Sequence, residues 1–532
     1  MPLASLWILR RLSMKPRFAV IGPLVIGWQR RTRFLVSYNP IIRAQGSFML
    51  GTMIRPLNEQ DDLDIDLVCE LTGKGASWTQ YDLKHKVGNR LKDHETYKRM
   101  LDEEGRRCWT LKYAQESNYH MDILPCLVAK DYKTVMERSF SASLGAIREL
   151  DNLAIRITDK ESANYRYDPS PENWMKSNPF GYGIWFIQRA TAGDRQKMML
   201  LAESVRAVPK YQSNKTPLQR AVQILKRHRD IMFAGDEDKP VSIIITTLAA
   251  KAYQGEGSIT EALQTILIHM DKYILNEFDP QSGKTIKKVE NPVNPEENFA
   301  DKWIEHPKRQ DNFYKWLEKV RKDLSLILQL RGMHVIAESM MPRFGRQAVS
   351  QGFDSLAEKA RSLRESGTMK MAAGSGILGS AGSVSAKAHQ FFRESVSNRV
   401  IPLSVQLGKL KHYFPNSTNY MDIHTNRLIW KTTLQPSELS LAYEIKIVYT
   451  LGQSPKVYVV SPKPLALADG AQRLPHVYDH VKQQLCLYYG PAREWTPDKM
   501  IADTIVRGLG VVASYEFWLV TGIWHGGGIH PR

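Results

Sequence analysis

The stretch Gln45–Leu71, QGSFMLGTMIRPLNEQDDLDIDLVCEL, decides how the fold of this chain is interpreted. A Gly-Ser pair near its start is followed by three aspartates in strict alternation, namely Asp62, Asp64 and Asp66. Successive side chains of a β-strand point to opposite faces, so the carboxylates would share one face and the intervening apolar side chains the other. Aspartate is a poor strand former, and like charges on one face repel each other. The stretch indicates either a solvated strand or a divalent-metal site, and the alternation favours the metal site.

The composition limits the class of protein. A chain of 532 residues predicts two or three domains. The formal net charge of +18 favours polyanionic ligands such as nucleotides or nucleic acid. Four cysteines without a C-x-x-C spacing indicate neither a zinc ribbon nor a disulfide scaffold, and they suit a reducing cytoplasm. The apolar run Phe18–Trp28 is too short to span a membrane, so we expect a soluble, cytoplasmic chain with no membrane partner.

Hydrophobic periodicity predicts both helices and strands. Apolar residues that recur every fourth position predict an amphipathic helix after the aspartate stretch, at Leu83, Val87 and Leu91. Two strand-like runs follow, over 108–113 and 119–124, and the pattern is then mostly helical to about residue 335. Residues 366–388 are rich in Gly, Ala and Ser, which predicts a flexible linker. Short alternating runs beyond it predict a small antiparallel meander in a separate domain.

Asp122, on the second strand-like run, completes the candidate metal site. If its strand pairs beside the first, Asp64, Asp66 and Asp122 converge on one point. Three carboxylates can hold two Mg²⁺ ions about 4 Å apart, with Mn²⁺ as an alternative, and such a pair promotes attack of a hydroxyl on a phosphate and departure of pyrophosphate. Gly46 and Ser47 would offer backbone N–H groups and a hydroxyl to the triphosphate at a strand-to-helix turn.

These residues look like the nucleotidyltransferase core of polymerase-beta-like enzymes. More specifically, the chain closely resembles the cyclic-oligonucleotide synthases of bacterial CBASS antiphage signalling, which are relatives of animal cyclic GMP-AMP synthase. The segments that carry this resemblance are QGSFMLGT, DLDIDLV, ILKRHRDIMF, KPVSIIITTLAAKAY and NPVNPEENFADKW. The resemblance covers roughly residues 40–393. It implies that Lys226 and Ser242 contact the donor triphosphate from a helical lobe. Without it, they would be interpreted as a surface lysine and a helix N-cap.

The C-terminal part resembles ubiquitin-conjugating enzymes, and more narrowly the conjugating-type protein encoded beside some CBASS synthases. The resemblance rests on SPKVYVVSPKP, LPHVYDHVKQQLCLYYG and EWTPDKMIADTIV. It implies that Cys486 is the thioester cysteine, His476 the matching histidine and Trp495 the tryptophan at a helix start. The alternative is an inert core cysteine between two leucines. Tyr478 stands where those enzymes have the asparagine that stabilises the oxyanion of isopeptide formation, so the sequence favours thioester formation over full ligation.

The resemblances predict an α+β chain: a polymerase-beta-like nucleotidyltransferase core with a helical second lobe, then a small ubiquitin-conjugating-like domain. The expected segments are an irregular N-terminal segment at 1–40, the catalytic core at 41–140, the helical lobe at 141–365, a linker and former synthase tail at 366–395, and the conjugating-like domain at 396–532. These synthases commonly end in a glycine at the position where Arg393 stands here, and this chain continues beyond it. The synthase tail and the conjugating-like domain are thus joined in one chain, either to act in cis or because two adjacent reading frames have been joined by readthrough or engineering.

The expected activity is Mg²⁺-dependent synthesis of a cyclic di- or oligonucleotide from nucleoside triphosphates, with no obligate nucleic acid. The C-terminal domain would bind or modify the synthase tail or another CBASS protein. The alternative is a linear oligonucleotide or tRNA-end nucleotidyltransferase with a non-catalytic C-terminal binding module. Intact carboxylates argue against a catalytically dead scaffold.

Overall fold

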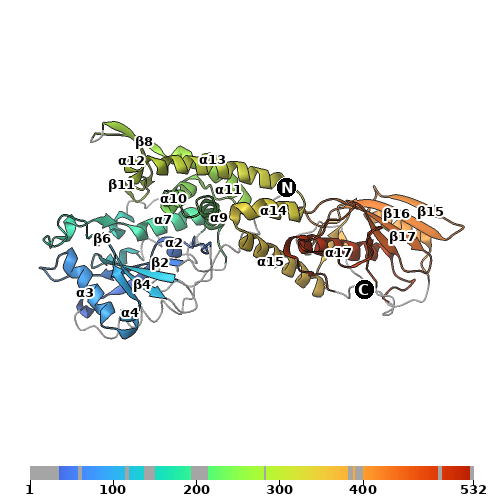
Figure 1. Ribbon diagram of the computed structural model, residues 1–532, viewed down its shortest axis with the longest axis horizontal. Helices are drawn as coiled ribbons and strands as arrows, with labels where there is room; N and C mark the ends of the chain where they lie inside the picture. Colours follow the sequence, from blue (N-terminus) through green and yellow to red (C-terminus); the bar gives the residue numbers. More distant parts are fainter. Residues whose placement is uncertain are drawn as a thin grey trace. The chain divides into compact units, whose positions relative to one another are not determined.

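The computed structural model describes residues 35–57, 63–113, 119–132, 134–136, 150–192, 194, 214–280, 283–380, 388–389, 400–488 and 494–527 (Figure 1). The expectations for Asp62, for residues 1–34 and for Arg393 fall outside this part of the chain. The described residues form two compact units that divide between Lys322 and Asp323, and each is described by itself.

A mixed sheet lies at the centre of the first unit. Its strands run in the order β1-β2-β5-β4-β3, with β6 paired to β5 and β7 to β6. Their bounds are Ile41–Ala44 for β1, Leu63–Leu71 for β2, Leu101–Glu104 for β3, Trp109–Tyr113 for β4, Tyr119–Leu127 for β5, Ile155–Ile157 for β6 and Lys176–Ser177 for β7. The expected strands at the aspartate stretch and at 108–124 are confirmed.

The pattern of β2 follows the predicted alternation. Leu63, Ile65 and Leu67 are buried, whereas Asp64 is exposed and Asp66 half-buried. The predicted amphipathic helix is α3 (Gln80–Lys92), and its three apolar residues at every fourth position are fully buried against this sheet. Burial of one apolar face thus fixes which side of β2 carries the carboxylates.

A helical layer completes the first unit. It contains α7 (Pro179–Thr191), α9 (Pro217–Met232), α10 (Ser242–Ala252) and α11 (Ile259–His269), and α9, α10 and α11 pack on one another (Figure 1). Shorter helices are α2 (Gly46–Met49), α4 (Glu95–Met100) and α12 (Lys302–Glu305). Two hairpins are β8 (Leu275–Asp279) with β9 (Lys284–Lys288), and β10 (Glu290–Asn291) with β11 (Asn294–Asn298). The units divide within α13 (Pro307–Gln329), whose apolar stripe is buried.

The second unit is built on a six-stranded antiparallel sheet in the order β15-β16-β17-β18-β20-β19. The strands are β15 (Thr418–Asp422), β16 (Arg427–Leu434), β17 (Tyr443–Thr450), β18 (Lys456–Ser461), β19 (Val477–Asp479) and β20 (Gln484–Leu485). The helices are α14 (Met333–Phe344), α15 (Arg346–Glu365), α16 (Leu403–Tyr413) and α17 (Ile501–Thr521). The expected meander, β16 to β18, is confirmed, and α17 closes its core.

Residues 366–380 differ from the flexible linker that their composition predicts. Strands β12 (Lys370–Ala372), β13 (Leu378–Gly379) and β14 (Ala388–His389) form a small sheet, and Met371 is buried in the apolar core of the second unit. Backbone N–H groups at Gly374 and Leu378 donate to carbonyls of Tyr413 and Pro436 at 2.9 Å. A segment rich in Gly and Ala can pack this closely because its side chains occupy little space.

No helix in the described ranges is long and apolar enough to cross a bilayer.

Candidate active site

The Gly-Ser pair lies where β1 turns into the short helix α2, as expected. Gly46 has φ +59°, a conformation that L-residues with side chains rarely adopt. A Cβ atom at this position would collide with the carboxylate of Asp66. The backbone N–H of Gln45 donates to the carbonyl of Asp66 at 2.9 Å, which fixes the turn against β2. Glycine is therefore required at position 46 both by the backbone conformation and by the adjacent carboxylate.

Asp66 and Asp122 are direct neighbours on the parallel strands β2 and β5. Thr110, opposite Asp122 on β4, donates its hydroxyl to Asp122 Oδ1 at 2.6 Å. Burial, followed by repulsion from Asp122 and Asp64, raises the pKa of Asp66 to about 6. Two carboxylates held side by side in a partly buried place fit a divalent cation, because a cation would relieve the repulsion that raises this pKa.

Asp64 has a different environment. Its side chain is 74% exposed and forms an ion pair with His120, its register partner on β5. In the described part of the chain, no three His, Cys, Asp or Glu side chains converge closely enough to hold a metal as placed. The structure therefore brings Asp66 and Asp122 together, and Asp64 would have to leave His120 to join them. The predicted three-carboxylate set remains a prediction.

Lys226 reaches this site from α9. Only 4% of the residue is exposed, so the interpretation as a surface lysine is wrong. Burial lowers the pKa of Lys226 to about 7, with Arg229 adding repulsion, while Asp230 and Asp66 oppose the change. Its Nζ donates to the carbonyl and the hydroxyl of Thr52 at 3.4 and 3.5 Å. The amine thus lies within electrostatic reach of the carboxylate site.

Two glutamines on α9 hold the loop that follows the Gly-Ser turn. Gln219 donates through Nε2 to the carbonyl of Leu50 at 2.8 Å, and Gln223 donates to the carbonyl of Met53 at 2.6 Å. Both side chains are buried. Neither glutamine belongs to a recognised motif, but their spacing of four residues, with Gln223 one turn before Lys226, places all three on a shared helix face.

Ser242 is the first residue of α10, with Val241 as the N-cap, so the interpretation as an N-cap serine is also wrong. Arg229 donates to Ser242 Oγ at 3.1 Å and to the carbonyl of Pro240 at 2.7 Å. Ser242 is therefore connected to the Lys226 environment through Arg229, whose charge contributes to the low pKa of Lys226. The contacts of Ser242 and Ser47 with the donor triphosphate stay predictions.

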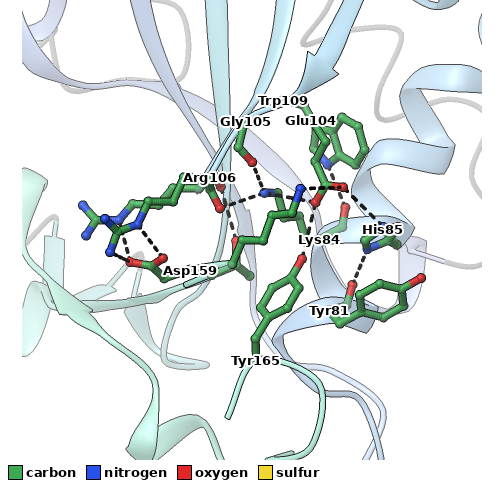
Figure 2. Close-up of polar contacts among 12 residues, drawn as sticks. Tyr81, Lys84, His85, Glu104, Gly105, Arg106, Trp109, Asp159 and Tyr165 are labelled. Carbon is green, nitrogen blue, oxygen red and sulfur yellow. Dashed lines mark hydrogen bonds and ion pairs between the residues drawn. The ribbon is translucent and has the colours of Figure 1, made fainter. Parts of the chain in front are cut away.

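The hairpin that carries Thr110 is anchored by a buried lysine (Figure 2). Lys84 of α3 donates to the carbonyls of Gly105 and Arg106 at 2.5 and 2.9 Å and pairs with Glu104 at 3.2 Å. The indole of Trp109, at the start of β4, donates to the carbonyl of Lys84 at 2.9 Å. These contacts tie the β3–β4 hairpin to α3 and so fix β4 beside Asp122.

A second candidate site lies in the second unit, around Cys486. A cavity of about 570 Å³ is lined by the thiol, by His476 and Trp524, and by the α17 residues Val506 and Arg507 among others. The Cys486 N–H donates to the carbonyl of His476 at 2.8 Å. The His476 and Trp524 rings stack at 4.6 Å between centroids. The structure therefore brings together the cysteine and the histidine that the resemblance implied.

Tyr478 and Trp495 lie near this cavity in different roles. The hydroxyl of Tyr478 donates to the carbonyl of Tyr488 at 2.6 Å, while nearly half of Tyr478 is exposed. Trp495 packs edge-on against Tyr488 and Tyr449, five residues before the N-cap of α17. Trp495 therefore lies ahead of the helix, not at its first turn, and packs against Tyr488, which lines the cavity.

The comparisons with known proteins match two parts of the chain. Residues 40–125 match the family described as cyclic GMP-AMP synthase DncV-like, nucleotidyltransferase domain, and residues 406–531 match the type II CBASS E2 protein family. A c-di-GMP synthase of Roseivirga ehrenbergii is 28% identical over 334 residues, which are 63% of this chain and 80% of that protein.

Two solved structures are similar at low identity. Bradyrhizobium diazoefficiens CD-NTase CdnG in complex with GTP has 19% identity and a TM-score of 0.46, covering 67% of this chain and 99% of that one. Vibrio cholerae DncV cyclic AMP-GMP synthase has 16% identity and a TM-score of 0.38, covering 58% and 70%. The family matches confirm the two resemblances found in the sequence: the chain carries a DncV-like nucleotidyltransferase domain and, after it, a type II CBASS E2 domain.

Proposed function

We propose that this protein makes a cyclic dinucleotide from two nucleoside triphosphates in CBASS antiviral signalling, and that the reaction needs Mg²⁺. The observation that carries the proposal is the pairing of Asp66 with Asp122 against Gly46, with the Lys226 amine nearby. The c-di-GMP synthase relative supports guanine nucleotides as substrates and a cyclic product.

Each residue of the site has a distinct role in the proposed reaction. Asp66 and Asp122, joined by Asp64, would hold Mg²⁺, which when bound assists attack of a ribose hydroxyl on an α-phosphate and neutralises the departing pyrophosphate. Lys226, whose pKa is lowered to about 7 by burial, can take up a proton when the donor triphosphate binds and so offset its charge. Gly46 allows the triphosphate to approach the backbone closely at the turn. Thr110 keeps one oxygen of Asp122 engaged, so that the carboxylate keeps a single orientation.

The linear-product alternative is separated from this proposal by one experiment. Purified protein with all four nucleoside triphosphates and Mg²⁺, followed by mass analysis, is expected to yield a cyclic dinucleotide without added DNA or RNA. A product that retains a 5′-triphosphate would support the linear alternative. A strict requirement for added nucleic acid would contradict the predicted independence from it.

For the E2 domain we propose a thioester-forming Cys486 that acts on the synthase tail or on another CBASS protein. The support is the cavity that contains both the thiol and His476. Type II CBASS E2 membership supports this class of partner.

Alkylation of the native protein distinguishes a functional Cys486 from an inert core cysteine. Cys69 and Cys126 are fully buried, and burial raises the pKa of each thiol. Burial and the charge of Asp122 raise the pKa of Cys108 to about 11. A mild alkylator at pH 7.5 is therefore expected to label Cys486 first, as mapped by peptide mass spectrometry. Labelling of Cys486 only after denaturation would refute a thioester role.

A further inference from the structure

The Cys486 cavity extends beyond the residues that match the E2 family. Arg364 from the end of α15, with Gly367 and Met369 after it, lines the same cavity as Cys486. These residues precede the matched range, which begins at 406. Because Met371 is buried in the core of the same unit, this wall is held in place by the fold.

Arg364 is a half-buried cation on the wall of this cavity. Its Nη2 donates to the carbonyl of His525 at 3.0 Å, and no ion pair to Arg364 is found within the described residues. Burial lowers the pKa of Arg364; neighbouring Glu365 opposes this change, and weaker repulsion from Arg361 adds to it. A partly desolvated guanidinium with only a neutral acceptor gains free energy when an anion binds beside it.

The carbonyl that holds Arg364 is itself fixed. His525 is 8% exposed and lies between two carboxylates one turn apart on α15, with Nδ1 3.3 Å from Glu358 and Nε2 3.7 Å from Asp354. The chain around 524–527 is thereby attached to α15, and Trp524 is kept over the His476 ring. The position of Arg364 is therefore fixed by its hydrogen bond to the His525 carbonyl, and His525 is in turn held by Glu358 and Asp354.

Arg507 adds a second guanidinium to the lining. Its nearest carboxylate, Glu494, is 4.0 Å away, and the guanidinium lies 5.1 Å from the centre of the Tyr488 ring. Glu494 lines the cavity as well, and the rest of the lining is largely apolar, with glycines that leave room for an extended backbone. The cavity thus combines a nucleophile, the cation Arg507 beside Glu494, the cation Arg364 and largely apolar walls.

We propose that this cavity selects acyl groups on peptides that carry an acidic side chain close to the reacting carbonyl, and that Arg364 determines this specificity. The proposal rests on the thioester role of Cys486. The step is thioester exchange: Cys486 Sγ attacks the carbonyl of a peptide thioester, a new C–S bond forms, the old C–S bond breaks, and the departing thiolate takes the proton that Cys486 loses. No oxidant or nucleotide is consumed.

The test uses the full chain and two glycine-ended peptide thioesters that differ only in Glu against Gln at the penultimate residue. The wild-type protein is expected to form the Cys486 adduct about three- to tenfold faster with the Glu peptide, a ratio typical of one partly screened charge pair. Arg364→Gln should bring the ratio close to one. Arg361→Gln is the matched control, because Arg361 lies on the same helix, pairs with Glu365 and does not line the cavity.

A second pair of probes measures the same selectivity without acyl transfer. Iodoacetate is an anion, whereas iodoacetamide is neutral and of nearly equal size. Arg364→Gln should lower the iodoacetate-to-iodoacetamide rate ratio at Cys486 by a similar factor, and Arg361→Gln should not. Equal ratios in wild type and Arg364→Gln, or an equal loss in Arg361→Gln, would overturn the proposed specificity. Selective alkylation without acylation by either peptide would retain the anion-selecting cavity and refute the thioester role.

Discussion

Asp66→Asn is expected to abolish nucleotide product while making the metal-free protein more stable. Asp66 is one of the two carboxylates that the structure places side by side, and its loss removes a ligand charge that the proposed Mg²⁺ needs. We expect a rate loss of about a thousandfold or more, as for removal of a central electrostatic group in other enzymes. Product formation from radiolabelled nucleoside triphosphates measures this directly.

The gain in stability follows from the pKa of Asp66. The folded-state pKa of about 6 lies above the ordinary value of 3.8, so the folded state holds this proton more tightly than the unfolded state does. Stability from this group is full below about pH 4 and is lost as pH rises through 6. The loss corresponds to roughly 3 kcal/mol above pH 6. Asp66→Asn should therefore gain in free energy of unfolding at pH 8 and gain little at pH 4.

Asp151→Asn is a matched control for both measurements. Asp151 is an exposed carboxylate that pairs with Lys176, and its removal should change neither activity nor stability by a measurable amount. Added Mg²⁺ should raise the melting temperature of the wild type and of Asp151→Asn, but not of Asp66→Asn. Full activity in Asp66→Asn, or an equal Mg²⁺ effect in all three proteins, would refute the metal assignment.

Much of the first site could be predicted from the sequence because strand geometry is restrictive. Alternation along β2 required Asp64 and Asp66 to share a face, and burial of Leu63, Ile65 and Leu67 left only one face available for them. Pairing of β5 beside β2 then placed Asp122 against Asp66. The motif spacing was sufficient for this part of the site, since few arrangements of two paired strands satisfy it.

Contacts between distant segments could not be predicted in the same way. Thr110 contacts Asp122 only because β4 pairs with the opposite side of β5. Gln219 and Gln223 look like solvent-facing helix residues until a loop carbonyl is placed above each of them. The pairing of Asp64 with His120 depends on side-chain orientation, which a period of two does not specify.

Composition gave a wrong indication between the two domains for a physical reason. Gly, Ala and Ser favour flexible chain when nothing contacts them, but small side chains also allow close packing when a partner is present. Residues 366–380 are packed in this way, and Met371 and Gly376, which are buried there, stand in no distinctive sequence pattern. The second unit therefore begins before residue 406, where the range that matches the E2 family begins. Arg364, which lies before that range, lines the Cys486 cavity.

Lys226→Met is expected to weaken binding of the nucleoside triphosphates by about ten- to a hundredfold, the usual value of a hydrogen bond to a charged group. Methionine retains most of the buried volume and removes only the amine. The measurement is KM for each nucleoside triphosphate beside kcat, and KM should carry the larger change. Lys251→Met is the matched control, because Lys251 is half-buried in the neighbouring helix and donates to the carbonyl of Glu290 at 3.1 Å.

The same variant should change stability in the opposite pH direction to Asp66→Asn. The folded-state pKa of Lys226, about 7, lies below its ordinary value of 10.5, so the unfolded state binds this proton more tightly. Stability from this group is present at high pH and is lost as pH falls from 10.5 through 7. Lys226→Met should therefore gain most in free energy of unfolding below pH 7, where Asp66→Asn gains less. A variant that is destabilised most at low pH would contradict this, because it would show that a strong anionic partner already holds the buried Lys226 amine. Lys226 would then not be available to bind a triphosphate.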